Sequence, residues 1–344
     1  MSESTPSVTP SEAPTALWSK ERLDGVLEVS GYGTTQLLPL SDGSLLLTNH
    51  RAKHPLLVYR VDGESRQVSP QAHPGDPGSW VVALSTEWLL LGQPWAKRCV
   101  LWNPVTGAHR DIEGEVPPGF SVCSDTHQGE AVVVVNVSSS GSDAGFDWSG
   151  DYTHLAVFDV ARGELKTPFH RVEDLDLRDI VLQDDGRLIG YGFGRVNPFF
   201  RLMDRELADQ STERERWNSF YMSHSEGVSV VGTDADRALV LFGRKSNEGQ
   251  RALMRCSLAS PRVETIATIE DGDIFYQSAT RLIDGATLLF CRRRFSSDVE
   301  LFRYDRHLSY AGLLPDTQMH HAAQATDGRV YVANSEEVFV LSAP

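Results

Sequence analysis

Cysteine is scarce in this sequence, with only four among 344 residues, at Cys99, Cys123, Cys256 and Cys291. None of them forms a C-x-x-C pair, and each lies in or beside an apolar segment. This pattern favours buried free thiols over disulfides or a zinc site. It fits a reducing compartment, so we expect a cytoplasmic protein.

Long apolar runs are also missing. No stretch approaches the roughly 18 consecutive apolar residues that a membrane-spanning helix requires, and the most apolar run is AVVVVNV at 131–137. The N-terminus has neither the basic region nor the apolar core of a secretory signal. Residues 1–20 are rich in Ser, Thr and Pro, so we expect a disordered tail there. We expect no contact with a membrane.

Positive charge is in short supply as well, because 47 Asp and Glu outnumber 32 Lys and Arg and leave a net charge of −15. Nucleic-acid binding needs a positive surface for phosphate contacts, so we expect no nucleic-acid partner. The segment GYGFG at 190–194 lacks the spacing and the following helix of a dinucleotide site. We find no phosphate loop, no G-x-S-x-G and no H-E-x-x-H, and we expect no cofactor, no metal and no assigned catalytic residue.

The sequence is rich in short apolar segments that follow turn residues. Seven of these pair a turn with an apolar strand: SDGSLLL (41–47), STEWLLL (85–91), HQGEAVVVV (127–135), DDGRLIGYG (184–192), DADRALVLFG (234–243), IDGATLLFC (283–291) and TDGRVYVAN (326–334). A second strand follows each: LLVYR (56–60), CVLWN (99–103), LAVFD (155–159), FRLMD (200–204), ALMRCS (252–257), LFRYD (301–305) and VFVLS (338–342). These pairs recur about every 37 to 56 residues, a spacing typical of propeller blades.

Each repeat also has an apolar segment before these two strands and usually another after them. We therefore predict an all-β fold, a single closed seven-bladed β-propeller of four-stranded blades over residues 21–344. The blades are expected at about 34–70, 79–114, 121–170, 179–206, 227–269, 275–315 and 319–342. The last blade lacks a fourth strand, and the segment DGVLEVSG at about 24–31 is predicted to supply it and close the ring, which removes exposed sheet edges.

The repeats resemble those of WD40-like propellers. In that family an aromatic residue followed by Asp ends the third strand, and Trp102-Asn103, Phe158-Asp159 and Tyr304-Asp305 are similar to it. Family blades also carry a histidine before the first strand, a region where this chain has His73, His170, His224 and His320. The resemblance covers about residues 24–344. It implies the propeller fold, on which function varies widely.

Basic residues gather in the predicted loops between second and third strands, which we name the top loops. Eleven Lys and Arg lie in five of them: Arg51, Lys53, Lys97, Arg98, Arg195, Arg244, Lys245, Arg251, Arg292, Arg293 and Arg294. An extended backbone would project Arg292 and Arg294 on one side and Arg293 on the other. Acidic blade-to-blade loops, including EDGD at 270–273, could neutralise these residues through weak surface ion pairs. Alternatively, some arginines could bind an anion or an acidic partner bidentately.

Our preferred hypothesis is a non-enzymatic scaffold that binds a protein partner through the top loops, within a larger complex. Two long insertions also carry aromatic residues of the kind that dominate interfaces. The candidate partner-binding residues are Arg51, Lys53, Trp95, Lys97, Arg98, Phe146, Trp148, Arg195, Arg244, Arg292 and Arg294. The alternative is an enzyme or a binder of a small ligand or metal, with His224, Tyr276, His320 and His321 at the mouth of the central channel.

Overall fold

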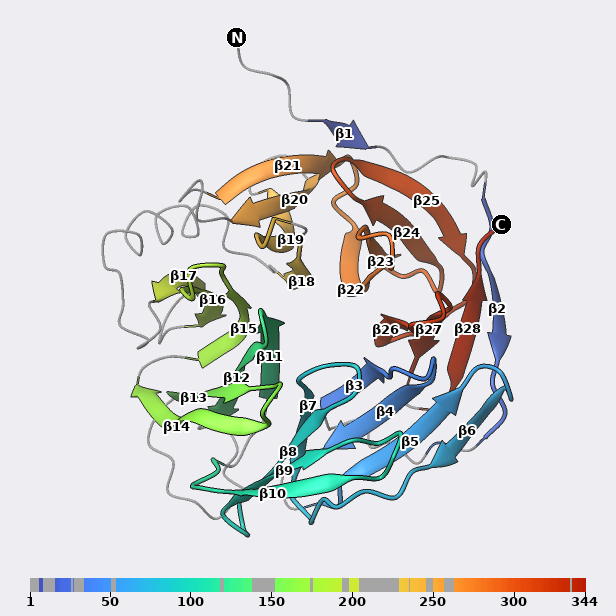
Figure 1. Ribbon diagram of the computed structural model, residues 1–344. Coiled ribbons are helices and arrows are strands. Elements are labelled where there is room, and N and C mark those ends of the chain that lie inside the picture. The colour runs from blue at the N-terminus through green and yellow to red at the C-terminus, as the bar shows by residue number, and fades with distance from the viewer. Residues whose placement is uncertain are drawn as a thin grey trace. The chain divides into compact units, whose positions relative to one another are not determined.

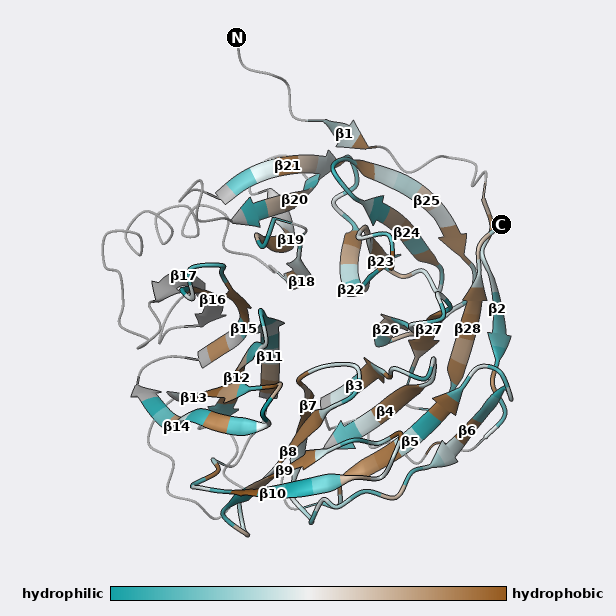
Figure 2. Cartoon of the chain, in the orientation of Figure 1, coloured by the Kyte–Doolittle hydropathy of each residue, from teal (hydrophilic) through white to brown (hydrophobic). Residues whose placement is uncertain are grey.

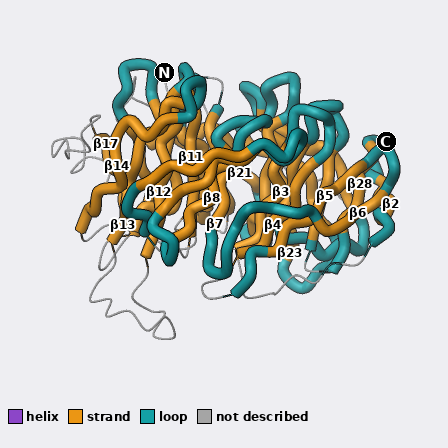
Figure 3. The backbone as a smooth tube through the Cα atoms, turned by 60° about the horizontal axis from the view of Figure 1, so that its bottom comes forward, coloured by secondary structure: helices purple, strands orange, loops and turns teal. Residues whose placement is uncertain are grey.

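The computed structural model describes most of the chain as strands joined by turns (Figure 1). The described residues are 6–8, 16–25, 27, 34–50, 54–117, 121–137, 152–173, 176–193, 198–203, 229–234, 236–245, 250–256, 263–334 and 336–344. Within these ranges the backbone contains strands and loops but no helix (Figure 3). Accordingly, the described part of the chain has no helix able to cross a membrane.

The described strands form seven sheets. In chain order, the first sheet consists of β3 (Thr34–Pro39), β4 (Leu45–His50), β5 (Leu57–Asp62) and β6 (Gln67–Pro70), and the second of β7 (Trp80–Ala83), β8 (Leu89–Gln93), β9 (Arg98–Trp102) and β10 (His109–Glu113). The third consists of β11 (Ser121–His127), β12 (Glu130–Val137), β13 (Tyr152–Asp159) and β14 (Glu164–Glu173). The fourth consists of β15 (Asp176–Leu182), β16 (Leu188–Phe193) and β17 (Pro198–Met203). The others consist of β18 (Ser229–Thr233), β19 (Leu239–Lys245), β20 (Gln250–Cys256) and β21 (Val263–Ile269), joined by β1 (Ser7–Val8); β22 (Ile274–Arg281), β23 (Thr287–Arg293), β24 (Val299–Tyr304) and β25 (Leu308–Leu314); and β26 (His321–Gln324), β27 (Val330–Ala333) and β28 (Val338–Ser342), joined by β2 (Ser19–Arg22).

The predicted pairs of second and third strands are all present as antiparallel neighbours. They are β4–β5, β8–β9, β12–β13, β16–β17, β19–β20, β23–β24 and β27–β28. The second strands were visible in the sequence because they are apolar. In Figure 2, β8 and its neighbour β7 are strongly apolar, whereas β10, at the other side of the same sheet, is hydrophilic. Every residue of β8 is buried, and β10 is mostly exposed. Strands buried on both faces carry continuous apolar runs, which is the pattern that the repeats show.

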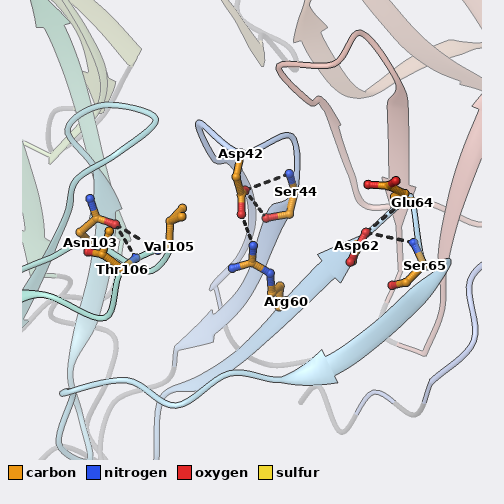
Figure 4. Close-up of polar contacts among 9 residues, drawn as sticks. All are labelled: Asp42, Ser44, Arg60, Asp62, Glu64, Ser65, Asn103, Val105 and Thr106. Carbon is orange, nitrogen blue, oxygen red and sulfur yellow. Dashed lines mark hydrogen bonds and ion pairs between the residues drawn. The ribbon is translucent and has the colours of Figure 1, made fainter.

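Aspartate side chains shape the turns that precede the apolar strands. In the turn after β3, the Asp42 carboxylate accepts hydrogen bonds from the Ser44 amide (3.2 Å) and hydroxyl (2.7 Å), as Figure 4 shows. The Asp284 carboxylate accepts from the Ala286 amide in the same way (3.0 Å). The glycine that follows each Asp takes the left-handed conformation, with φ of 86° at both Gly43 and Gly285. The Asp-Gly pairs are therefore required by the turns themselves.

The same aspartates bind an arginine at the end of the third strand. The Arg60 guanidinium pairs with Asp42 (Figure 4), and Arg303 pairs with Asp284 at 2.7 Å. In the sheet of β18–β21, Arg255 pairs with both Asp234 (2.6 Å) and Asp236 (2.7 Å). Each ion pair joins the turn before the second strand to the strand beside it.

The chain divides into two compact units. The first unit comprises Met1–Leu27, Asp62–Val68 and Glu215–Pro344, and the second comprises Glu28–Val61 and Ser69–Arg214. Aromatic side chains occupy the core of each. Trp80 and Phe158 are fully buried in the second unit, and Phe290 and Phe302 are fully buried in the first.

Hydroxyl side chains on first strands join neighbouring sheets within each unit. In the second unit, the hydroxyls of Ser124 and Thr126 on β11 donate to carbonyl oxygens of residues 83 and 84, at the end of β7 (2.6 and 2.8 Å). In the first unit, the hydroxyls of Ser278 and Thr280 on β22 accept from the amides of residues 322 and 324 on β26 (3.0 and 2.8 Å). The spacing of two residues places both hydroxyls on one side of the strand.

The described parts of the N-terminal segment, residues 6–8 and 16–20, contact other strands where a disordered tail was expected. Ser7–Val8 pairs in parallel with β21, Leu17 forms a bridge with Leu313, and Ser19–Arg22 pairs with β28 (Figure 1). The strand that joins the β26–β28 sheet is thus Ser19–Arg22 and not the predicted segment 24–31, most of which lies outside the described residues. Backbone pairing, and not burial, selects this strand, because three of its four side chains are exposed.

Candidate functional site

A turn with unusual exposure follows β23 in the first unit. The last two residues of β23 and the turn after it, residues 292–298, are together named the Phe295 turn below. The Phe295 side chain is 96% exposed, and its backbone has a φ of 64°. The turn is held by backbone hydrogen bonds from the Arg294 amide to the Asp273 carbonyl (2.8 Å) and from the Ser296 amide to the Arg293 carbonyl (3.0 Å). A left-handed conformation is an outlier for a bulky side chain, so the turn fixes Phe295 in an unfavourable backbone state.

The three consecutive arginines of this turn have different partners. Arg293 binds Asp271 (3.1 Å) and Glu300 (3.5 Å). Within the described residues, neither Arg292 nor Arg294 takes part in an ion pair, and both side chains are exposed. The Arg294 guanidinium lies 5.1 Å from the centroid of the Phe295 ring. Local neutralisation, one of the two hypotheses for these residues, therefore applies to Arg293.

Glu300 is the most enclosed acid beside this turn, with 8% of its surface exposed. Its carboxylate accepts a hydrogen bond from the Tyr310 hydroxyl (2.7 Å) in addition to its pairing with Arg293. Burial raises the pKa of Tyr310, and the Glu300 carboxylate raises it further, so this hydroxyl stays protonated. The acid is thus satisfied inside the sheet and is not free to neutralise another arginine.

A second arginine–aromatic contact lies at the start of β22. The guanidinium of Arg251, which is 6% exposed, lies 4.6 Å from the centroid of the Phe275 ring. Phe275 itself is 40% exposed and pairs in register with Arg292 on β23. Arg251 was counted among the basic residues of the top loops, but Phe275 was not predicted as a site residue. An aromatic residue directly after an acidic loop was the available signal.

In the second unit, the turn between β8 and β9 exposes another aromatic residue. Trp95 is 59% exposed and lines an open depression of about 540 Å³ with Asp76, Pro77 and Ala96. Lys97 closes the turn with a φ of 53°, and its amide donates to the Pro94 carbonyl (3.3 Å). The exposed tryptophan and lysine remain candidates for contact with a partner.

Arg98, in contrast, is engaged within its own sheet. Its guanidinium binds the Asp111 carboxylate (2.7 Å) and donates to the Gln93 side-chain oxygen (2.7 Å). Both partners come from strands beside β9, so this side chain holds the sheet together. A partner would have to displace these bonds to bind it.

The alternative histidine site is only partly assembled. The rings of His320 and His321 lie 6.5 Å apart at the start of β26. Burial, and to a smaller extent the charge of His320, lower the pKa of His321 to about 4. Tyr276 packs against Phe242, with 6.2 Å between ring centroids. His321 is therefore neutral and weakly basic near pH 7, which suits a structural role better than general-base catalysis.

Several predicted site residues lie outside the described residues: Arg51, Lys53, Phe146, Trp148, Arg195 and His224. For Arg244, the structure describes only the backbone, which belongs to β19. Among the residues that are described, no cluster of three or more His, Cys, Asp or Glu has the geometry of a metal site. Cys99 and Cys291 are buried free thiols, as predicted, and the Cys123 side chain is half-buried.

One pair of acids was not predicted from the sequence. The pKa of Asp179 is raised to about 7, mainly by burial and also by the charge of Asp125, against the opposing effect of the hydrogen bond from the Ile180 amide. Asp125 lies on the neighbouring strand β11 and accepts a hydrogen bond from the Leu182 amide (2.6 Å). An aspartate inside a strand of apolar residues, as in RDIVL at 178–182, was the signal for such a group.

Comparison with known proteins identifies the fold. No family model and no curated protein matches the sequence. Solved structures do match: a streptogramin B lyase has a TM-score of 0.60 at 11% identity, covering 97% of this chain and 100% of its own. The Cps50 (Swd1) β-propeller domain from Myceliophthora thermophila has a TM-score of 0.55 at 12% identity, covering 93% of this chain and 99% of its own. The fold is a WD40-like β-propeller.

Other solved structures with a similar fold include both WD40 repeats and a lyase. The RRP9 WD40 repeats have a TM-score of 0.54 at 13% identity, covering 94% of this chain and 99% of their own. An oligogalacturonate lyase from Vibrio parahaemolyticus has a TM-score of 0.60 at 12% identity, covering 96% of this chain and 97% of its own. These identities establish the fold alone, and the propeller's function has to be argued from its own side chains.

Proposed function

We propose that this propeller is a non-enzymatic scaffold that binds a protein partner through its top loops. In this proposal it works in the cytoplasm as part of a larger complex. Its seven sheets are the blades of one ring, and β2 closes that ring by completing the sheet of β26–β28. The pairing of Ser19–Arg22 with β28 supports this closure. A rigid ring would present the top loops as a preformed surface.

The Phe295 turn is the observation that carries the proposal. A phenylalanine with 96% of its surface exposed gains almost nothing from burial, yet it occupies a left-handed backbone state that glycine would adopt without strain. Exposed aromatic and arginine side chains are the residues that most often dominate protein interfaces. Trp95 is a second exposed aromatic side chain, at the corresponding turn of another sheet.

A capture experiment from extracts of the native host tests this function. The tagged wild-type protein is expected to retain a defined partner, identified by mass spectrometry, and a variant with Trp95, Arg292 and Arg294 changed to alanine is expected to lose most of it. The control changes Arg281 and Arg306 to alanine, two exposed arginines at the opposite end of the β22–β25 sheet. Equal recovery of the partner by both variants would contradict the assignment to the top loops.

The second candidate function is binding of a small ligand or metal near His320 and His321. The adjacency of the two rings favours it, since a neutral imidazole is the form that coordinates metals. Metal analysis of the purified protein, together with a screen for hydrolase and lyase activity, tests this candidate. If metal content or activity is found, it should disappear in a His320→Ala, His321→Ala variant that keeps its thermal midpoint. A metal-free and inactive wild-type preparation would rule this candidate out.

A further inference from the structure

The Phe295 turn combines two features of a peptide-binding surface. Arg292 and Arg294 are exposed cations two residues apart, and the ring of Phe295 lies beside the Arg294 guanidinium. We infer that this turn docks an acidic peptide segment of a partner protein, in which carboxylates flank an apolar side chain. This inference rests on the proposed scaffold function and specifies the chemistry of its partner.

The local charge of the turn favours an acidic ligand. Arg293 pairs with Asp271 and with Glu300, so both of these acids are engaged by Arg293 and neither pairs with Arg292 or Arg294. The Asp298 carboxylate accepts a hydrogen bond from the Asp316 amide (2.9 Å), which fixes it within the loop. The positive charges of Arg292 and Arg294 therefore have no fixed acid opposite them among the described ion pairs.

One acid near the turn opposes binding and provides a sharp test. The Asp273 backbone carbonyl accepts the Arg294 amide, and the Asp273 side chain is exposed. Because the Asp273 backbone is hydrogen-bonded to that of Arg294, a negative charge on this residue would repel an acidic peptide bound at the turn. Neutralising this side chain should therefore raise the affinity without disturbing the backbone hydrogen bond.

The backbone of the turn is organised before any partner arrives. The Asp298 amide donates to the Ser296 hydroxyl oxygen (3.0 Å), and the Thr317 amide donates to the Ser297 carbonyl (2.8 Å). Together with the bonds to Asp273 and Arg293, these contacts tie both ends of the turn to neighbouring segments. A rigid turn loses little conformational entropy when it binds a partner. The turn can therefore present the Phe295 ring in the same backbone conformation before and after binding.

The chemistry of the three exposed side chains describes the ligand. The planar guanidinium groups bind carboxylates bidentately, and the phenyl ring covers an apolar side chain. In an extended peptide, residues i and i+2 lie on one side about 7 Å apart, so acids at alternate positions face the same side and can reach two separate cations. The expected ligand is thus an extended segment with acids at alternate positions around an aromatic or aliphatic residue.

The binding test uses a dye-labelled peptide of the sequence EDEFEDE, measured by fluorescence anisotropy with the full-length protein. A matched peptide, QNQFQNQ, keeps the size and the phenylalanine but removes the charge. The acidic peptide is expected to bind at least tenfold more tightly than the neutral one, with affinity falling as salt is raised. A single-stranded DNA oligonucleotide of equal charge is expected to bind at least tenfold more weakly than the acidic peptide.

Variants of the turn locate the binding. Changing Arg292 and Arg294 to alanine is expected to weaken binding of the acidic peptide at least tenfold, whereas changing Arg281 and Arg306 removes the same charge and should alter it less than twofold. Asp273→Asn is expected to strengthen binding about twofold. Phe295→Gly should weaken binding about fivefold without lowering the thermal midpoint, because glycine accepts the left-handed backbone.

The outcomes separate this inference from the proposed function. Equal affinity for the acidic and neutral peptides, or no effect of the Arg292 and Arg294 substitutions, would overturn the acidic-ligand assignment. If host extracts still yield a partner that depends on Trp95, the scaffold function stands and only the ligand chemistry is wrong. DNA binding equal to that of the peptide would also overturn the inference, because it would assign the turn to anions in general.

Discussion

Substitution of Gly92 by alanine is expected to destabilise the core of the second unit. Gly92 lies on β8, in register with Trp80 on β7. A Cβ atom at Gly92 would lie 2.0 Å from Cε2 and 2.1 Å from Cζ2 of the Trp80 indole. These distances are far below any van der Waals contact, so either the indole or the backbone must move.

The size of this effect follows from how tightly Trp80 is held. Its side chain is 0% exposed, its Nε1 donates to the Pro117 carbonyl (2.9 Å), and its ring packs edge-on against Phe169 with 6.0 Å between centroids. Overpacking of a core typically costs about 1–3 kcal/mol, and loss of the buried hydrogen bond adds about 1 kcal/mol. We therefore expect Gly92→Ala to lower the free energy of unfolding by about 2–4 kcal/mol.

Urea unfolding followed by circular dichroism measures this change, and a double-mutant cycle identifies its cause. Trp80→Phe alone should destabilise the protein, because it leaves a cavity and loses the bond to the Pro117 carbonyl. In the Gly92→Ala background the smaller phenyl ring makes room for the new methyl group. Trp80→Phe should therefore lower the free energy of unfolding by about 1–2 kcal/mol less in this background than in the wild type.

Gly129→Ala provides the control, since Gly129 has a φ of 82° but no neighbouring atom within 4 Å of the position that a Cβ would take. It should cost about 1 kcal/mol through backbone strain alone and show no coupling to Trp80. Strictly additive effects of Gly92→Ala and Trp80→Phe would refute the steric argument. So would a Gly92→Ala protein within about 0.5 kcal/mol of wild type.

Three further predictions concern titration and ion pairing. The raised pKa of Asp179, about 7, means that the folded state keeps a proton that the unfolded state releases, so the stability from this group falls as pH rises from about 4 to about 7. In urea titrations across this range, Asp179→Asn should reduce the loss of unfolding free energy with pH. An unchanged pH dependence would contradict the assignment. The lowered pKa of His321, about 4, acts in the opposite direction. Its contribution to folding stability is present above about pH 6.5 and is lost as pH falls toward 4. His321→Gln should therefore reduce the loss of unfolding free energy between these pH values. Arg255→Leu should cost about 1–3 kcal/mol in thermal or urea unfolding, because it leaves the buried Asp234 carboxylate without its cation; Arg303→Leu, which removes an exposed pair, should cost no more than about 1 kcal/mol.

Local sequence patterns were sufficient to predict most of the strands. The turn at Asp42 and the one at Asp284 both require a side-chain oxygen at the first position and a left-handed residue at the next, so Asp-Gly marks them directly. The apolar runs that follow are buried on both faces, which leaves a continuous hydrophobic signal. The third strands were equally visible, because they pair with these runs along their full length.

The N-terminal strand was placed wrongly for a physical reason. Ser19–Arg22 has the sequence SKER and carries no apolar pattern. It joins the sheet through backbone hydrogen bonds to the edge of β28, and such bonds depend little on side-chain identity. The hydrophobic pattern of DGVLEVSG at 24–31 was therefore the stronger signal in the sequence but did not identify the strand that pairs.

The sequence alone determined the all-β class, the turns and the repeated strand pairs of this protein, because these depend on interactions between residues that are close along the chain. It also located the basic top loops, including Arg292–Arg294. Only the tertiary structure decided which of these arginines is neutralised, since the partners of Arg293 are acids from a different loop and a different strand. The tertiary structure also decided that Phe295 is exposed, that Asp179 is buried and that Trp80 packs on Gly92. These properties depend on which strands lie side by side, which no local pattern encodes.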